Sequence, residues 1–223
     1  MKYASPDPLT AVASYNYQMT PVYWQQASVA LAQADPVMAT LVERYAGAAL
    51  ASRGDPFATL ARSIVGQQIS VKAADAVWVR FATQVGAVTP EGVLALGATG
   101  LIGCVLSQRK IEYLYDLATH FVNGRLQPAT WGLLEDAAVI AELTAVRGIG
   151  RWTAEMFLIF NLLRPDVFPI DDIGLQRAIE LHYCSGERLA QRALAEFGER
   201  WRPWRSVATW YLWRSLDPVP VEY

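Results

Sequence analysis

The stretch "LTAVRGIGRWTAEMF", residues 143–157, reads as the end of one helix, a short hairpin and the start of a second helix. Glycine is favoured where the backbone takes a positive φ or approaches another group closely, and Gly148 and Gly150 flank Ile149 as in a tight turn with an inward apolar residue. The second helix is then expected to begin near Gly150. Its first N–H groups lack acceptors within the helix and point outward at the positive end of the helix dipole, which suits a phosphate. A plain helix–loop–helix, whose glycines only end one helix and start another, is the alternative.

Apolar residues recur at helical spacing on both sides of this hairpin. The predicted face before it comprises Leu133, Ala137, Ile140, Ala141 and Thr144, and the predicted face after it comprises Ala154, Phe157, Leu158 and Leu162. Residues suited to cap a helix start are Asp35, Asp55, Ser70, Thr89 and Ser107. Alternating strands joined by tight turns are hard to find. We therefore predict an all-α protein of about ten helices.

The composition is that of a packed globular chain. Of its 223 residues, 53% are hydrophobic and 18% are charged, which excludes a largely disordered protein. The first residues have no apolar run of signal-peptide length, and no window approaches the roughly 20 apolar residues of a membrane span. We expect a cytoplasmic protein without membrane contact. The formal net charge of −2 gives no broad attraction for nucleic acid, so any DNA binding has to be local.

Four stretches together resemble one family. The hairpin stretch resembles the helix-hairpin-helix of the DNA glycosylases, and "RPDVFPIDDIGLQRAI" (164–179) resembles the Gly/Pro-rich loop and aspartate that complete their shared motif. "ARSIVGQQISVKAA" (61–74) and "ERWRPWRSVATWYLWR" (199–214) are similar to segments of alkylation-repair glycosylases of the 3-methyladenine DNA glycosylase II type. The resemblance runs from about residue 55 to residue 216.

This resemblance implies two helical lobes with the active site in the cleft between them. The central lobe would cover about residues 70–165, and the second lobe about residues 1–69 and 166–223. The helix-hairpin-helix would span about residues 135–162. The N-terminal β-domain of larger alkylation glycosylases is expected to be absent.

In the family, hairpin carbonyls hold a monovalent cation, sodium or potassium, which with hairpin N–H groups binds a DNA phosphate. Carried over, the carbonyls belong to Thr144, Val146 and Ile149, and the N–H donors to Gly148 and Gly150. Gln68 would be the wedge that fills the space left by a flipped base. Gln67 would help to hold the opposite strand, unless both glutamines are simply solvated. Arg151, Arg202 and Arg205 either reach phosphates or form surface ion pairs.

The catalytic aspartate of this branch follows the first aromatic residue of the second hairpin helix by 20 positions, which leads from Trp152 to Asp172. Asp171 is then expected to cap the following helix, although the Asp pair taken alone reads as an N-cap pair. Bifunctional members have a lysine nucleophile where this chain has Trp152, so strand-cleaving lyase activity is not expected. With two cysteines in the whole sequence, no iron–sulfur cluster is expected, and no organic cofactor is implied.

Trp152 and Trp213 match the two tryptophans of the family's base pocket, whereas other tryptophans, such as Trp78 and Trp131, are expected in the core. Met156 and Ile173 stand at pocket positions where the best-known enzyme of this branch has tyrosines. Arg147 stands where the hairpin often has proline. This departure leaves the turn less rigid, and the two pocket positions leave the range of lesions open.

The resemblance therefore implies a monofunctional glycosylase that removes alkylated bases, chiefly 3-methyladenine, from double-stranded DNA and leaves an abasic site, and we expect it to act as a monomer. A carboxylate beside C1′ stabilises the positive charge that develops on the sugar and orients the attacking water. The base has to be flipped out of the duplex, and a cationic methylated purine stacks well on aromatic walls. Two alternatives stay open: a glycosylase for another damaged or mismatched base, and a helix-hairpin-helix protein that binds DNA without chemistry.

Overall fold

The computed structural model describes residues 20–52 and 54–216, and these residues form helices and connecting loops with no strand. The predicted all-α class is confirmed, and the described part contains more helices than the ten or so expected. The helices are α1 (Trp24–Ala34), α2 (Pro36–Arg44), α3 (Pro56–Gly66), α4 (Val71–Val85), α5 (Pro90–Ile102), α6 (Gln108–Val122), α7 (Pro128–Trp131), α8 (Asp136–Thr144), α9 (Arg151–Phe160), α10 (Ile173–Tyr183), α11 (Gln191–Gly198), the 3-10 helix η1 (Glu199–Trp201) and α12 (Arg205–Leu216).

The five predicted helix starts are confirmed by hydrogen bonds from the capping side chains. Asp35 Oδ1 accepts from the N–H groups of Val37 and Met38 at 2.9 and 3.2 Å. The side chains of Asp55, Ser70, Thr89 and Ser107 each accept from the backbone N–H three residues further on. Each cap satisfies a donor that the first helical turn leaves unpaired. The starts of these five helices are therefore encoded locally.

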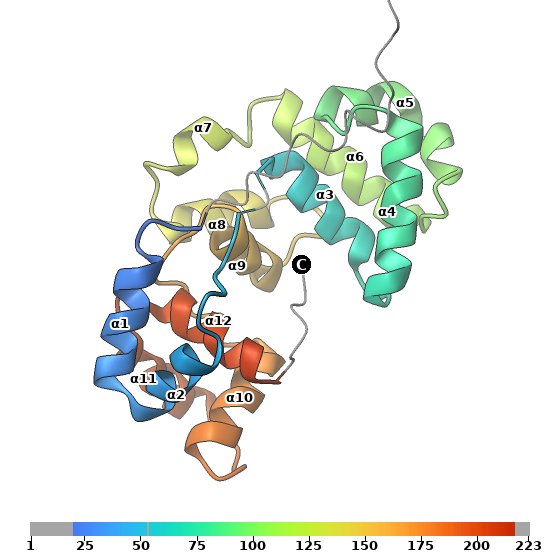
Figure 1. The fold of residues 1–223 in the computed structure, drawn as a ribbon. Helices are drawn as coiled ribbons and strands as arrows, with labels where there is room; N and C mark the ends of the chain where they lie inside the picture. The colour runs from blue at the N-terminus through green and yellow to red at the C-terminus, as the bar shows by residue number, and fades with distance from the viewer. Residues whose placement is uncertain (1–19, 53, 217–223) are drawn as a thin grey trace, which may run out of the picture.

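The helices gather in two groups joined through the hairpin helices (Figure 1). In one group α12 packs against α1, α2 and α10, and in the other α5 packs against α4 and α6. Helix α3 lies N-terminal to the predicted lobe boundary at residue 70, and it packs against α4, α6 and α9. The division of the whole chain into two lobes stays a prediction.

The apolar face predicted before the hairpin is wrong. Leu133 is 90% exposed and precedes α8, which begins at Asp136. Ala137, Ala141 and Thr144 are exposed and Ile140 is only half-buried, whereas α8 buries Val139 and Leu143 against α9. A short helix rich in alanine fits more than one helical register. Periodicity alone could not separate these registers.

Helix α9 follows the predicted pattern. Ala154, Phe157 and Leu158 are buried, and Leu162, beyond the end of the helix, is half-buried. The Phe157 ring packs edge-on against Trp131, which is fully buried as expected, with the ring centroids 5.2 Å apart. Helix α9 is thus anchored in the core through its buried face.

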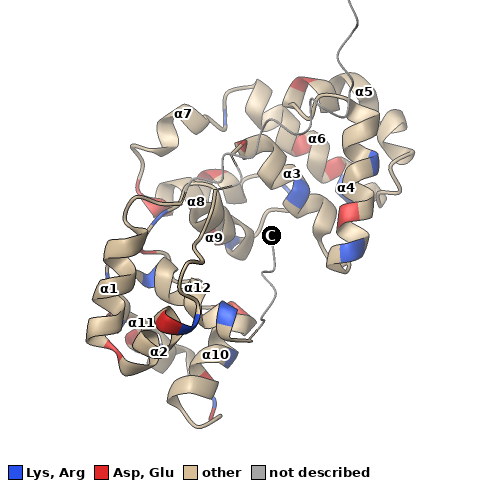
Figure 2. Cartoon of the chain, in the orientation of Figure 1, with Lys and Arg blue, Asp and Glu red and all other residues tan. Residues whose placement is uncertain are grey.

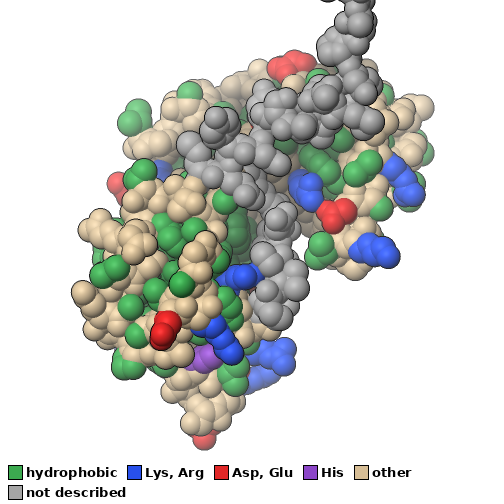
Figure 3. All heavy atoms as spheres, in the orientation of Figure 1, with side chains coloured by type: hydrophobic (Ala, Val, Ile, Leu, Met, Phe, Trp, Pro, Cys, Tyr) green, Lys and Arg blue, Asp and Glu red, His purple; other side chains and the backbone are tan. Residues whose placement is uncertain are grey.

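Charged side chains of both signs are spread over both groups of helices (Figure 2). The space-filling view likewise shows Lys and Arg side chains and acidic side chains on both groups, with some Lys and Arg side chains near one another on the lower group (Figure 3). In the described part of the chain, no single helix is long and apolar enough to cross a membrane. Helices α4 and α5 reach that length and hydropathy only when they are taken together, and they are bent by 99° relative to each other.

Candidate active site

The loop between α9 and α10 is tied to the start of α12. Ser206 Oγ accepts the Val167 N–H at 2.9 Å, and the Ser206 N–H donates to the Pro165 carbonyl at 3.0 Å. Ser206 itself is fully buried. At the end of the loop the Asp172 N–H donates to the Pro169 carbonyl at 2.9 Å. The loop therefore holds Asp172 in a fixed relation to α12.

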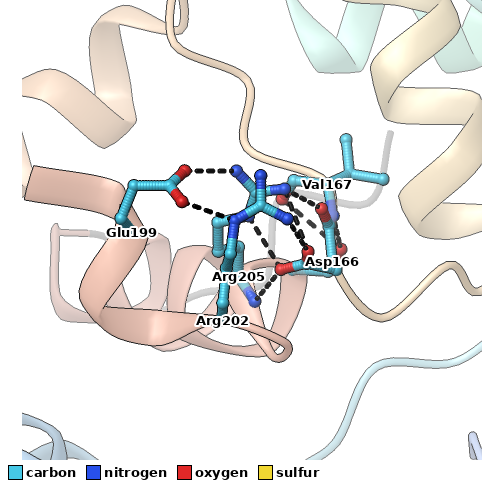
Figure 4. A network of polar contacts seen from close by, with 6 residues as sticks. Asp166, Val167, Glu199, Arg202 and Arg205 are labelled. Atoms are coloured by element: carbon cyan, nitrogen blue, oxygen red, sulfur yellow. Dashed lines mark hydrogen bonds and ion pairs between the residues drawn. The ribbon is translucent and has the colours of Figure 1, made fainter. Parts of the chain in front are cut away.

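A network of ion pairs around Asp166 reinforces this junction (Figure 4). Arg205 donates to Asp166 through Nε at 2.7 Å and Nη2 at 3.0 Å, and Arg202 Nη1 donates to Asp166 at 2.8 Å. Glu199 accepts from both arginines, at 2.6 and 3.2 Å. Both arginines therefore form the ion pairs that the sequence left open, and contact of the 50% exposed Arg202 with a phosphate stays a prediction. The Arg205 side chain is only 15% exposed and fixes the first turn of α12.

Asp172 is the N-cap of α10 and is 8% exposed. Its Oδ1 accepts the Leu175 N–H at 2.6 Å. The prediction that Asp171 caps this helix is wrong: Asp171 is exposed, and its Oδ1 accepts from Gln191 Nε2 at 2.9 Å. The capping side chain has to come from the extended residue immediately before the first helical residue, and that residue is Asp172, with φ −74° and ψ 116°.

Two tryptophans from different helices donate to the same carboxylate. Trp152 Nε1, from the first turn of α9, donates to Asp172 Oδ2 at 2.8 Å. Trp213 Nε1, from α12, donates to Asp172 Oδ1 at 2.8 Å. The structure thus brings together the three residues that the resemblance singled out for catalysis and for the base pocket.

Two neighbours of this cluster had not been predicted. The Phe160 ring stacks on the Trp213 ring with centroids 5.8 Å apart and an interplanar angle of 14°. A Cβ at Gly174 would lie 3.1 Å from Asp172 Oδ1 and 3.3 Å from Trp213 Cδ1, which is closer than ordinary van der Waals contact. Glycine at this position allows Trp213 to reach the carboxylate.

The arrangement presents a fixed negative charge. An ionised carboxylate offers about four lone-pair sites. Among the described residues, Leu175, Trp213 and Trp152 donate to three of them, and one site remains on Oδ2. Such a preorganised carboxylate can stabilise a developing cation and accept a hydrogen bond from a water molecule.

Met156 and Ile173 differ in exposure. Met156 lies one helical turn after Trp152 and is 5% exposed, whereas Ile173 follows Asp172 and is 78% exposed. Their assignment to a base pocket stays a prediction.

Glu155 is a buried carboxylate on α9 that had not been predicted to belong to the site. It is 3% exposed, and its Oε1 accepts from Arg151 Nε at 2.9 Å. Burial raises the pKa of Glu155, while the adjacent Arg151 opposes this shift. The Arg151 side chain is 65% exposed, so a contact between Arg151 and DNA stays a prediction.

The hairpin has the geometry expected of it. Gly148 has φ +85°, and a Cβ there would overlap the ring of Tyr113 on α6, so that no larger residue fits. Ile149 is 4% exposed and points inward as expected. Gly150 has φ −91° and is the N-cap of α9, with open space where its Cβ would be. Gly148 therefore serves the turn, and Gly150 leaves the helix start accessible.

The hairpin N–H groups fall into two sets. The Val146 and Ile149 N–H groups donate to the carbonyls of Leu143 and Val146, both at 3.1 Å. The N–H groups of Gly148 and Gly150 donate to no acceptor within residues 20–52 and 54–216. These are the two groups expected to bind phosphate.

The two glutamines after α3 have different environments. Gln67 Nε2 donates to the Gly148 carbonyl at 2.8 Å, so this side chain links α3 to the hairpin. Gln68 is exposed and has φ +59°, an uncommon conformation for a residue other than glycine. The roles predicted for both residues on DNA stay predictions.

Comparison with known proteins identifies the family of this chain. The family model of the HhH-GPD superfamily base excision DNA repair proteins matches residues 61–203. A putative DNA-3-methyladenine glycosylase of Bacillus subtilis is 30% identical over 188 residues, which cover 81% of this chain and 66% of that protein. The crystal structure of a DNA-3-methyladenine glycosidase from Bacillus halodurans is 38% identical, with a TM-score of 0.76 and coverage of 84% of this chain and 87% of that one.

A Schizosaccharomyces pombe 3-methyladenine DNA glycosylase, solved in complex with abasic DNA, is 29% identical with a TM-score of 0.74, covering 89% of this chain and 98% of that one. The two solved structures share the overall fold described above. The chain belongs to the HhH-GPD superfamily of base excision DNA repair proteins, in the branch of the DNA-3-methyladenine glycosylases.

Proposed function

We propose that this chain is a monofunctional DNA glycosylase that hydrolyses the N-glycosidic bond of alkylated bases, chiefly 3-methyladenine, in double-stranded DNA. The observation that carries the proposal is the buried Asp172 carboxylate, held by indole N–H groups from Trp152 and Trp213. A protein that only binds DNA could use Asp172 to cap α10, but it would not need the two indole donors. One chain supplies all of these residues, and we propose that it acts as a monomer.

Asp172 is the catalytic residue. As the bond between C1′ and the base nitrogen breaks, positive charge develops on the sugar, and the carboxylate stabilises it. The remaining acceptor site on Oδ2 orients a water molecule for attack at C1′ and takes up its proton. The base leaves as a neutral purine because its methylation had made it cationic, so no general acid is needed. The product is an abasic site, the kind of DNA with which the S. pombe relative was solved.

The tryptophans have two roles at once. Their N–H edges hold the carboxylate, while an indole face of the 38% exposed Trp152 is a surface on which a flipped cationic base can stack. Met156 and Ile173 would shape the remainder of the pocket. A lysine in place of Trp152 would be needed for strand cleavage, and we therefore propose hydrolysis without lyase activity.

The hairpin binds the DNA backbone. The N–H groups of Gly148 and Gly150, just before α9, donate hydrogen bonds to a phosphate oxygen. The carbonyl oxygens of Thr144, Val146 and Ile149 are hard, neutral ligands of the kind that suit sodium or potassium, and they would hold a monovalent cation that supplies positive charge beside that phosphate. Gln68 would enter the space left by the flipped nucleotide, and Arg151 would contact a neighbouring phosphate.

A panel of duplexes tests the proposal, each carrying one lesion: 3-methyladenine, 7-methylguanine, hypoxanthine, uracil or 8-oxoguanine. Each is incubated with enzyme and then split into samples with and without alkali. We expect cleavage of the methylated purines after alkali and no cleavage without it, with Asp172→Asn as the inactive control. Release of only a deaminated or oxidised base would show that the proposed substrate is wrong. Release of no base would favour a protein that binds DNA without chemistry. Cleavage without alkali would contradict the monofunctional assignment.

A further inference from the structure

We infer that Asp116, on α6, is a positioning residue for the phosphate-binding hairpin. Its Oδ2 accepts the backbone N–H of Arg147 at 2.8 Å. Arg147 directly precedes Gly148, so this bond fixes the peptide unit next to one of the two N–H groups that have no acceptor among the described residues. The inference rests on the proposed role of the hairpin in binding DNA, and it adds a residue to which no part of the motif points.

The bond belongs to a set of contacts that fixes the inner side of the turn. Tyr113, one helical turn before Asp116 on α6, lies against Gly148 where a Cβ would be. Gln67, on the other side, donates to the Gly148 carbonyl at 2.8 Å. The Arg147 N–H and the Gly148 carbonyl are therefore both held by side chains from α6 and α3. Among the described residues, the Gly148 and Gly150 N–H groups remain without an acceptor.

The backbone bond, and not the side-chain ion pair, is the relevant contact. Arg147 Nε lies 4.0 Å from Asp116 Oδ1, and the Arg147 side chain is 62% exposed, so this pair is screened by solvent. His120 Nδ1 lies 3.7 Å from Asp116 Oδ2. The Asp116 side chain is 22% exposed, and a hydrogen bond from an N–H to a charged acceptor in such a place is stronger than one between neutral groups.

This arrangement also explains how the hairpin can have arginine at position 147. A proline there would fix φ near −65° and would have no N–H to place. Arginine does not fix φ, and it has a backbone N–H. The Asp116 carboxylate restrains the same peptide by accepting a hydrogen bond from that N–H. Proline at 147 and the Asp116 bond are thus two alternative ways of restricting one turn.

The electrostatic effect of Asp116 on DNA binding has the opposite sign to its positioning effect, which makes the test decisive. A carboxylate near a phosphate site weakens DNA binding by repulsion, so its removal for that reason alone would tighten binding. Asp116→Asn removes the charge but keeps an acceptor oxygen for the Arg147 N–H. Asp116→Ala removes both.

The experiment is a fluorescence-anisotropy titration of an undamaged duplex at one low salt concentration, with the full chain. We expect Asp116→Ala to weaken binding about tenfold, equivalent to about 1.4 kcal/mol and near the net value of one hydrogen bond. Asp116→Asn should bind at least as tightly as the unsubstituted chain. Glu112→Ala is the matched control, because it removes a carboxylate from the same helix that accepts only from Gln108 among the described side chains.

The variants Arg147→Ala and Arg147→Pro separate the role of the backbone N–H from that of the side chain. Both variants lose the guanidinium group, but only Arg147→Pro also loses the backbone N–H that donates to Asp116. Asp116→Ala should weaken binding about tenfold again in the Arg147→Ala chain and have little effect in the Arg147→Pro chain. Thermal denaturation of every variant identifies any that fail to fold. If Asp116→Ala is one of them, Asp116→Ser replaces it in the same comparisons, because the serine side chain is one atom shorter than that of aspartate and does not reach the Arg147 N–H. Unchanged or tighter binding by Asp116→Ala, or equal effects in both Arg147 backgrounds, would overturn the inference.

The readout is independent of base excision. If the lesion panel fails while Asp116→Ala weakens binding to undamaged DNA, the assigned substrate is wrong and the positioning role holds. If excision of methylated purines succeeds while Asp116 has no effect, the positioning role is wrong and the glycosylase holds.

Discussion

Trp152 and Asp172, 20 residues apart in the chain, are joined by a 2.8 Å hydrogen bond from the indole Nε1 to the carboxylate Oδ2. The spacing that the resemblance supplied thus corresponds to a direct contact. Trp152 is the second residue of α9 and Asp172 precedes the first residue of α10, so the bond connects the starts of two successive helices. It places the indole beside the proposed catalytic carboxylate.

Asp172→Asn should abolish excision and leave the fold intact. Asparagine can still cap α10 through its side-chain oxygen, but its amide nitrogen cannot accept from Trp152 and it carries no charge to stabilise the sugar cation. We expect the single-turnover excision rate to fall by about 100-fold or more. Asp171→Asn is the control, and it should retain most activity because Asp171 is exposed and bonds only Gln191 among the described residues. Equal loss in both variants would exclude the assignment of Asp172.

Trp213→Phe should slow excision without weakening DNA binding. Phenylalanine keeps an aromatic ring against Phe160 but removes the N–H donor to Asp172 Oδ1, and a hydrogen bond to a charged group contributes about 1.5–3 kcal/mol. We expect the single-turnover rate to fall about tenfold or more at an unchanged dissociation constant for an abasic duplex. Trp204→Phe is the matched control, since Trp204 stacks on Tyr23. A fall in affinity with an unchanged rate would assign Trp213 to binding alone.

Substitutions at the two hairpin glycines should have opposite effects on stability. Gly148→Ala should destabilise the fold by about 2–4 kcal/mol, because alanine disfavours φ +85° and its Cβ would overlap Tyr113. Gly150→Asp should stabilise it by a few tenths of a kcal/mol, because Asp is a good N-cap residue and the space is open. Thermal denaturation measures both. In a gel-shift titration Gly150→Asp should nevertheless bind DNA much more weakly, and unchanged binding would contradict the role of the hairpin.

Glu155→Gln should remove a pH-dependent loss of stability. Burial raises the pKa of Glu155 above that of the unfolded chain, so between those two values the folded chain binds more protons than the unfolded one. Stability therefore decreases as the pH rises through that window, which starts near the ordinary Glu pKa of about 4.3. We expect the melting temperature of the unsubstituted chain, relative to Glu155→Gln, to fall as the pH rises above the ordinary Glu pKa of about 4.3. Asp136, whose pKa burial also raises, is present in both chains and cancels in the difference. A constant difference would show that Glu155 does not titrate in this way.

Local sequence features predicted much of the fold. Capping residues such as Ser70 and Ser107, and the glycine needed at 148, depend on backbone conformation within a few residues, and each prediction was correct. The face of α8 was not predictable in this way, because α8 buries Val139 and Leu143 against a helix that lies beyond the hairpin. Asp171 failed as a cap because the start of α10 depends on where the preceding loop ends.

The candidate site, like the fold, was predictable only in part. Asp172, Trp152 and Trp213 came from the resemblance, and the structure brings them together. Gly174 and Asp116 could not have been found from the sequence. The requirement at Gly174 comes from the Trp213 ring, which approaches from α12, and the role of Asp116 comes from a backbone N–H 31 residues away. Neither contact leaves a periodic or spacing signal.

Asp172 also couples two parts of the molecule mechanically. Trp152 belongs to α9, which packs on α8 and α3, and Trp213 belongs to α12, which packs on α1, α2 and α10. A hydrogen bond is lost when its atoms separate by about 0.5–1 Å beyond their usual distance. The carboxylate therefore keeps both indole donors only at one relative position of these two helices. A change that moved α9 away from α12 would release the carboxylate from one of its indole donors, even if Asp172 itself were unaltered.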